Sequence, residues 1–177
     1  MVRAGLCIGC GGCAGDKGPL QLDRFGLLKP EGEWTAKPTG SLARTCPFSP
    51  EATNEDEIAE ARFPESSFRD PLIGSFETAY VGHVAEQTFR PQGSSGGMVS
   101  WVAAELLRRG LVDGVAHVAP ADPEQDGRFF TYRISRSVDE VQAGSRSRYY
   151  PVELSQVLEE VRAAPGRYAV VGVPCFI

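Results

Sequence analysis

Three cysteines lie within seven residues near the start of the chain, and their spacing constrains the fold more strongly than any other feature. Cys7, Cys10 and Cys13 form a C-x2-C-x2-C run. A fourth thiol follows at Cys46, with Pro47 directly behind it. Loops of this spacing bind three corners of a 4Fe-4S cluster, and a separate Cys-Pro can supply the fourth ligand. Zinc modules usually present two separated C-x2-C pairs, so the spacing favours the cluster, with structural zinc and plain buried thiols as the alternatives.

The residues around these cysteines are expected to form a small head. Glycines let backbone N–H groups turn toward the sulfurs, and the segment contains four of them, Gly9, Gly11, Gly12 and Gly15. Residues 20–22 and 27–28, separated by turn residues, predict a β-hairpin. This hairpin would fold the chain back and deliver Cys46 to the other three thiols.

Charge and composition argue against several classes of partner. The 18 basic and 23 acidic side chains give a net charge of −5, which leaves no broad basic face for nucleic acid. No signal-peptide pattern and no apolar stretch approaching about 18 residues is present, so no membrane span is predicted. The default compartment is therefore the cytoplasm. Cytosolic cysteines seldom form structural disulfides, so the clustered cysteines indicate metal binding first.

Three parts are expected along the chain. Residues 1–50 would form the cluster-binding head, because they are rich in Gly and Pro and show no helical period. Residues 51–75 would form an acidic tether: 51–62 is either a solvated helix or a loose segment, and the two prolines in 63–71 indicate a linker. Residues 76–177 would form the second domain.

The second domain alternates helical and strand patterns. Apolar residues recur at helical spacing from Met98, and Gly110 is a natural end for that helix; a second helical stripe runs from Leu154 to Val161. Strands are expected at 112–118, 128–134 and 168–173, the last a continuous apolar run typical of a strand buried on both faces. The fold class is therefore α/β, or α+β overall, with some parallel strands. A buried strand this close to Ile177 indicates a fold that continues beyond this piece.

A loop of glycine and serine directly precedes the first of these helices. Gly93-Ser94-Ser95-Gly96-Gly97 resembles an anion-binding helix start, because backbone N–H groups and hydroxyls can approach a phosphate there. The loop lacks the Lys-Ser/Thr of a P-loop. By itself it is more typical of a flexible loop with an ordinary N-cap.

Three segments together resemble the coenzyme F-420 hydrogenase/dehydrogenase beta-subunit family, which includes formate dehydrogenase beta subunits and chlorophyll-pathway reductases. They are CIGCGGC…CP, GSSGGMVSWVAAELLRRGLVDGVAHV, and AGSRSRYYPVELSQVL…YAVVGVPCFI. Their order and separation are similar to those of the family, and the resemblance covers nearly the whole chain except the acidic tether. Members of the family are longer, so the chain corresponds to an N-terminal part, with a flavin domain truncated at the C-terminus.

The resemblance implies a ferredoxin-like head followed by a flavin-binding α/β domain, with FAD and at least one 4Fe-4S cluster bound. Cluster ligands would be Cys7, Cys10, Cys13 and Cys46. Flavin contacts would come from Gly93, Ser94, Ser95, Gly96, Gly97 and Met98, and from Ser147, Arg148 and Tyr149. Arg148 would neutralise negative charge, or else face solvent. Cys175 would lie near the flavin or ligate a second cluster, and a buried structural cysteine is its alternative.

The expected function is that of an iron–sulfur flavoprotein oxidoreductase, which moves electrons between a 4Fe-4S cluster, FAD and a diffusible redox partner such as coenzyme F-420. The partner would be the deazaflavin coenzyme or a redox protein, either ferredoxin or a hydrogenase or dehydrogenase catalytic subunit. A ferredoxin-dependent reductase of another organic substrate and a non-enzymatic zinc-binding interaction module are the alternatives. His83 and His117 are expected to be structural, because both stand among apolar residues away from any carboxylate or thiol pattern.

Overall fold

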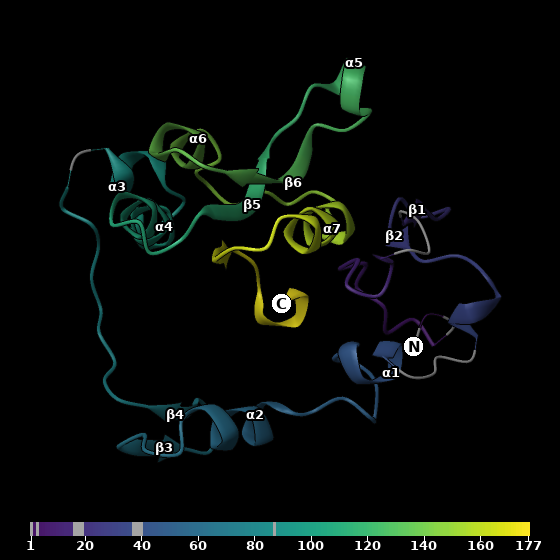
Figure 1. The fold of residues 1–177 in the computed structure, drawn as a ribbon, viewed down its shortest axis with the longest axis horizontal. Helices are drawn as coiled ribbons and strands as arrows, with labels where there is room; N and C mark the ends of the chain where they lie inside the picture. The colour runs from purple at the N-terminus through teal and green to yellow at the C-terminus, as the bar shows by residue number, and fades with distance from the viewer. Residues whose placement is uncertain (1, 3, 16–19, 37–40, 87) are drawn as a thin grey trace. The chain divides into compact units, whose positions relative to one another are not determined.

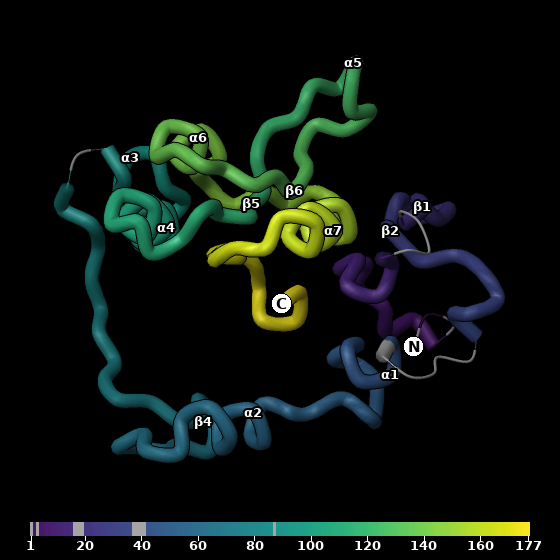
Figure 2. The backbone as a smooth tube through the Cα atoms, in the orientation of Figure 1, coloured from purple at the N-terminus to yellow at the C-terminus, as the bar shows by residue number. Residues whose placement is uncertain are grey.

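A computed structural model of the protein describes residues 1–177 except 1, 3, 16–19, 37–40 and 87. The chain divides into two compact units, which are described separately. The first combines Met1–Lys37 with His83–Ile177, and the second is Pro38–Gly82. Figure 2 follows the backbone of each unit by colour along the chain. The functional domains expected at 1–50, 51–75 and 76–177 stay a prediction.

A three-stranded sheet forms the centre of the first unit. β5 (Gly114–Pro120) pairs antiparallel with β6 (Phe130–Ser135) and parallel with β7 (Tyr168–Val170), in the order β6-β5-β7. The strands expected at 112–118 and 128–134 are confirmed to within two residues. The expectation of a strand buried on both faces at 168–173 is wrong, because β7 has three half-buried residues and lies at an edge of this sheet.

Helices cover both faces of this sheet (Figure 1). Neighbouring residues of a strand point to opposite faces. Val115 accordingly packs with Ala103 of α4 (Met98–Arg108) and with Val141 of α6 (Val138–Ala143). Ala116 packs with Val157 of α7 (Ser155–Ala163). This layering confirms the mixed α/β class, and the helices at 98–108 and 155–163 agree with the apolar periodicity.

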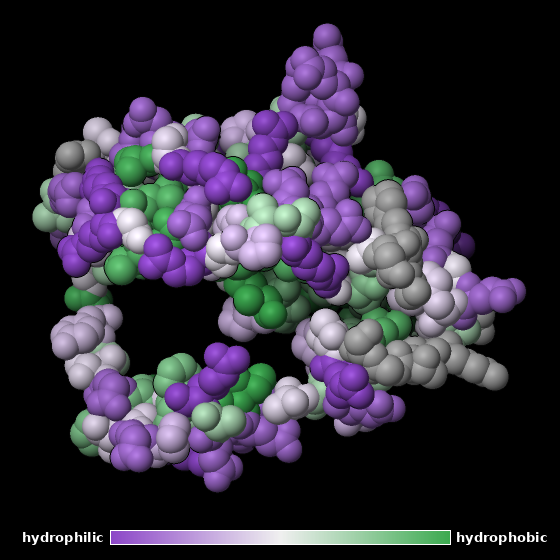
Figure 3. All heavy atoms as spheres, viewed as in Figure 1, coloured by the Kyte–Doolittle hydropathy of each residue, from purple (hydrophilic) through white to green (hydrophobic). Residues whose placement is uncertain are grey.

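Shorter elements complete the first unit. β1 (Gln21–Leu22) and β2 (Leu28–Lys29) form the predicted antiparallel hairpin. The others are η2 (Glu33–Thr35), α3 (Phe89–Gln92), α5 (Pro123–Asp126) and η3 (Pro174–Phe176). α5 stands between β5 and β6, and the surface around it is hydrophilic (Figure 3).

The second unit contains two helices and a hairpin. α1 (Ser41–Thr45) is followed by α2 (Glu55–Arg62), where Asn54 and Glu57 form a capping box. Of the two alternatives for residues 51–62, the structure therefore has the helix. β3 (Phe68–Asp70) and β4 (Gly74–Phe76) pair antiparallel, with the rings of Phe68 and Phe76 stacked at 5.6 Å. The linker expected at 63–71 is thus wrong from Phe68 onward.

Charge is unevenly divided between the units. Residues 38–82 contain eight acidic side chains and three arginines, a net charge of −5 that equals that of the whole chain. No helix within the described part of the chain has the length and apolar character needed to cross a membrane.

Candidate functional site

The glycine–serine loop is held between α3 and α4 of the first unit. Gly97 has φ +76°, a conformation that favours glycine, and a Cβ there would lie 2.6 Å from the carbonyl oxygen of Phe89. Phe89 is itself buried. The backbone N–H of Val84 donates to the carbonyl of Gly96 at 2.9 Å. The loop is therefore fastened on both sides and is not a loose connection.

The loop leads directly into the N-terminus of α4. The N-terminal end of a helix carries about half a positive charge and several free N–H donors, so it favours an anion. Gly97 is the N-cap residue of this helix, and Met98 begins it.

A hydrogen bond brings the second predicted flavin segment to this loop. The backbone N–H of Ser147 donates to the Oγ of Ser94 at 2.7 Å. Beside it, Nε of Arg146 donates to the carbonyl of Gln92 at 3.2 Å. Arg146 has φ +81°, which costs about 1–3 kcal/mol in a residue other than glycine and is typical of ligand-binding segments. The hydrogen bond between Ser147 and Ser94 thus brings together the two segments that the resemblance assigns to the flavin.

Arg148, which follows Ser147 in the chain, has an unsatisfied polar atom. Its guanidinium lies over the ring of Phe130, 5.0 Å from the centroid, and its buried Nε has no hydrogen-bond partner among the described residues. Leaving a buried donor unpaired costs about 1–3 kcal/mol, and more for a charged group. Tyr149 next to it is fully exposed.

The hydrogen-bond donors of these segments suit the phosphates of a flavin dinucleotide. A glycine-lined helix start, a hydroxyl at Ser94 and an unpaired guanidinium Nε at Arg148 are all donors suited to an anion. Donors of this kind fit FAD, although the individual flavin contacts stay a prediction.

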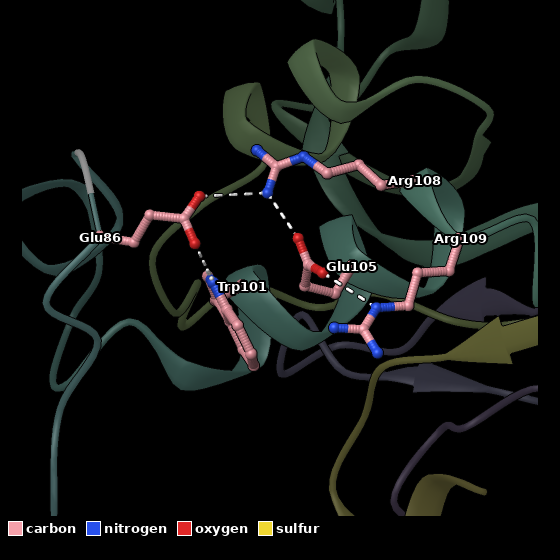
Figure 4. Close-up of polar contacts among 5 residues, drawn as sticks. All are labelled: Glu86, Trp101, Glu105, Arg108 and Arg109. Atoms are coloured by element: carbon pink, nitrogen blue, oxygen red, sulfur yellow. Dashed lines mark hydrogen bonds and ion pairs between the residues drawn. The ribbon is translucent and has the colours of Figure 1, made fainter.

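A polar network fastens the residues before the loop to the outer face of α4 (Figure 4). Glu86 accepts from the indole N–H of Trp101 at 2.8 Å and pairs with Arg108 at 3.2 Å. Arg108 also pairs with Glu105 at 2.7 Å, and Arg109 pairs with Glu105 at 3.1 Å. Hydrogen bonds from Arg108 and then Arg109 lower the pKa of Glu105.

His117 has the structural role that the sequence predicts. It lies buried in β5, and its Nε2 is 2.7 Å from the Oγ of Ser135. Burial lowers the pKa of His117, against a smaller opposing effect of the Glu140 carboxylate. His83 is exposed and lies outside any strand.

The cysteine loop of residues 7–13 rests against both β2 and α7. Nζ of Lys29 donates to the carbonyl of Cys7. The N–H of Leu154 donates to the carbonyl of Cys10 at 2.8 Å. Gly11 has φ +83°, and a Cβ there would lie 2.9 Å from the backbone nitrogen of Ser155. The loop is therefore docked at the start of α7 by its main chain.

The four-cysteine ligand set stays a prediction. Cys7, Cys10 and Cys13 belong to the first unit, whereas Cys46 belongs to the second, where its N–H donates to the carbonyl of Leu42 at 3.0 Å. Within the described residues, no group of three or more His, Cys, Asp or Glu side chains is arranged to hold a metal ion. Thiolates at this spacing fit an iron–sulfur cluster by the chemistry of the donors alone.

Cys175 is exposed in η3, so the alternative of a buried structural cysteine is wrong. Glu153 is a further candidate that the sequence analysis did not single out. Its carboxylate is buried, and its Oε2 accepts from the N–H of Ser155 at 2.7 Å. A glutamate directly before an amphipathic helix is an available signal, but the pattern does not reveal that the cysteine loop covers it.

A comparison with known protein families confirms the resemblance for residues 79–159. Residues 79–159 match the family model described as coenzyme F420 hydrogenase/dehydrogenase, beta subunit N-term. A solved structure of the F420-reducing [NiFe] hydrogenase complex from Methanosarcina barkeri, studied by xenon derivatization, is similar with a TM-score of 0.49 and 18% identity. The match covers 61% of this chain and 37% of that one. No curated protein matches the chain.

Proposed function

Residues 79–159 match the N-terminal segment of the coenzyme F420 hydrogenase/dehydrogenase beta-subunit family, and from this premise we propose an electron-transfer oxidoreductase that uses FAD and a 4Fe-4S cluster. The observation that carries the proposal is the hydrogen bond between Ser147 and Ser94, which unites the two segments assigned to the flavin. Arg148 supports it, because its buried Nε needs an acceptor that a ligand phosphate would supply.

Separate sets of residues would hold the flavin and the cluster. The N-terminus of α4 and the Ser94 hydroxyl bind and orient the flavin phosphates, and Arg148 neutralises their charge. Cys7, Cys10, Cys13 and Cys46 hold the cluster as thiolates. The cofactors supply one-electron and hydride chemistry, while the protein fixes their positions and limits access of oxygen.

The partner and the compartment are also proposals. The matching family is that of beta subunits of coenzyme F420 hydrogenases and dehydrogenases, which makes deazaflavin and a hydrogenase or dehydrogenase catalytic subunit the first partners to test. Ferredoxin is the second. Clustered thiols are kept reduced in the cytoplasm, so we place the protein there.

Anaerobic purification tests the proposal directly. The expected protein is brown, releases FAD on denaturation, and contains about four irons and four acid-labile sulfides per chain. Reduced protein should then transfer electrons to F420 or to an added ferredoxin. A colourless protein that contains one zinc ion and no sulfide would instead support the zinc-binding interaction module. A brown and yellow protein that reduces neither acceptor would favour a reductase of another organic substrate.

A further inference from the structure

One irregular stretch of the first unit, residues 147–154, contacts both candidate cofactor sites. At its start Ser147 donates to Ser94 of the glycine–serine loop, and at its end Leu154 donates to Cys10 of the cysteine loop. We infer that this stretch, here called the connector, fixes the spacing between the two loops, with Glu153 as its positioning residue. The inference deepens the proposed function and rests on it only for the electron-transfer measurement described below.

The length of the connector limits how far apart the two loops can be. Even if it were fully extended, its backbone could span at most roughly 25 Å between Ser147 and Leu154. Because both of its ends are hydrogen-bonded, any change in its path would move one loop relative to the other.

The middle of the connector packs against the start of β6. The Tyr150 ring lies edge-on to Phe129 and Phe130, with centroid distances of 6.1 and 5.6 Å. The N–H of Phe129 donates to the Tyr150 hydroxyl at 3.4 Å, and Arg148 lies over Phe130. The connector is therefore attached to the sheet along its length, so it can hold a distance that a free loop could not.

The Glu153 carboxylate packs between the cysteine loop and the first turn of α7 at the end of the connector. Its side chain is 2% exposed, its Oε2 accepts from Ser155, and its Oε1 lies 4.0 Å from Nη1 of Arg128. The backbone of Gly11 contacts the Glu153 carboxylate so closely that a Cβ at Gly11 would overlap with it. The carboxylate thus fills the space beneath the cysteine loop and also caps the first turn of α7.

Leu154 contacts both the cysteine loop and the hydrophobic core beside the sheet. Its N–H bonds to Cys10, whereas its side chain is 2% exposed and packs with Ala116 and Val157. A shift of the cysteine loop would therefore have to displace either this hydrogen bond or a core side chain.

Two pairs of variants test the connector. Glu153→Ala removes the support beneath Gly11, and Glu153→Gln is its control, because the amide oxygen keeps the acceptor for Ser155 and the shape. Tyr150→Ala removes the central packing, and Tyr150→Phe is its control. Tyr150 serves this purpose because its contacts described above are with Phe130 of β6 and with Phe129 directly before it, and with neither loop.

Hydrogen exchange on the purified chain gives the first measurement. Both alanine variants are expected to exchange faster than wild type in peptides that cover Cys7 to Ala14, at temperatures where circular dichroism shows them folded. Both controls should exchange like the wild type. Unchanged exchange in both alanine variants, or faster exchange confined to the mutated residue, would overturn the inference.

Electron transfer between flavin and cluster after rapid reduction gives the second measurement. The rate in Tyr150→Ala should fall by at least about tenfold while iron content, flavin content and both midpoint potentials stay at wild-type values, as expected for misplaced reaction partners. An unchanged rate with faster exchange would mean that the connector does not set the spacing. A protein that binds neither iron nor flavin would refute the proposed function, and the exchange measurement would still decide the structural inference.

Discussion

Ser94 and Ser147 lie 53 positions apart in the chain, yet the Oγ of Ser94 accepts a 2.7 Å hydrogen bond from the N–H of Ser147. A second link between the same two regions, from the Ser145 hydroxyl to that of Ser100 at 3.2 Å, supports this arrangement. The residues assigned to one ligand on the basis of separate sequence motifs are therefore neighbours in the fold.

Replacement of Gly97 by alanine should reduce flavin retention. The substitution places a Cβ at φ +76° and 2.6 Å from the Phe89 carbonyl oxygen, so the loop must move. Gly127→Ala is the matched control, because Gly127 has φ +64° and a Cβ there would meet none of the described atoms within 4 Å. Both variants should lose about 1–2 kcal/mol to backbone strain. Only Gly97→Ala should also release flavin, measured by absorbance after gel filtration, and equal flavin content in the two would place the site elsewhere.

Replacement of Arg148 by methionine should weaken flavin binding without removing the cluster. A hydrogen bond to a charged group contributes about 1.5–3 kcal/mol, which corresponds to a roughly 10- to 100-fold rise in Kd. Arg133→Met is the control, because Arg133 belongs to β6, the strand whose Phe130 Arg148 packs on, but pairs with Asp126 at 2.7 Å on an exposed surface. Titration of the apoprotein with FAD measures both. If Arg148→Met binds FAD as tightly as Arg133→Met does, Arg148 is not a ligand-binding residue.

Replacement of Cys46 by serine should abolish the 4Fe-4S signal or leave a three-iron form, because the C-x2-C-x2-C run stays intact. Cys175→Ser is the comparison, since Cys175 is exposed and is not one of the four ligands predicted for this cluster. Iron and sulfide analysis with electron paramagnetic resonance distinguishes the two. Loss of iron from Cys175→Ser alone would reverse the assignment.

His117 should make the free energy of unfolding depend on pH below about 6.5. Burial lowers the pKa of His117 below the 6.5 of an unperturbed histidine. As the pH falls through 6.5, the unfolded chain therefore binds a proton that the folded protein does not, and stability decreases by at most about 1.4 kcal/mol per pH unit. His117→Gln should flatten this slope.

The pH range of the measurement separates His117 from the neighbouring Glu140. Hydrogen bonds from the N–H groups of Arg136 and Ser137 lower the pKa of Glu140 from 4.5, so its contribution to stability is lost only as the pH falls further, from about 4.5 downward. Urea unfolding between pH 5.5 and 7 therefore isolates the histidine. An unchanged slope in His117→Gln would show that other groups are responsible.

Sequence patterns predicted the elements that have a long apolar period, which are α4, α7 and the β5–β6 pair. They missed α6, because it has only six residues and two large apolar side chains. The capping box of Ser137 and Glu140 was a usable signal for it. The β3–β4 hairpin was missed because Pro64 and Pro71 suggested a linker, although both prolines lie outside the strands.

The candidate site was predictable where a motif is local and less so where it depends on tertiary contacts. Glycine spacing indicated the loop before α4, but the positive φ of Arg146 and the unpaired Nε of Arg148 result from packing. Similarly, periodicity could not show that the apolar run of β7 forms an edge strand, because the order of the strands in the sheet is set by tertiary contacts.

The hydrogen bond from Leu154 to Cys10 joins residues that are made at very different times during protein synthesis. Roughly 140 residues separate them, and at about 5–20 residues per second their synthesis takes roughly 7–30 s. During that interval the cysteine loop can dock on β2, through Lys29, but not on α7. The complete docking surface of the loop forms only after α7 has been made, so we expect cluster loading to follow the folding of α7.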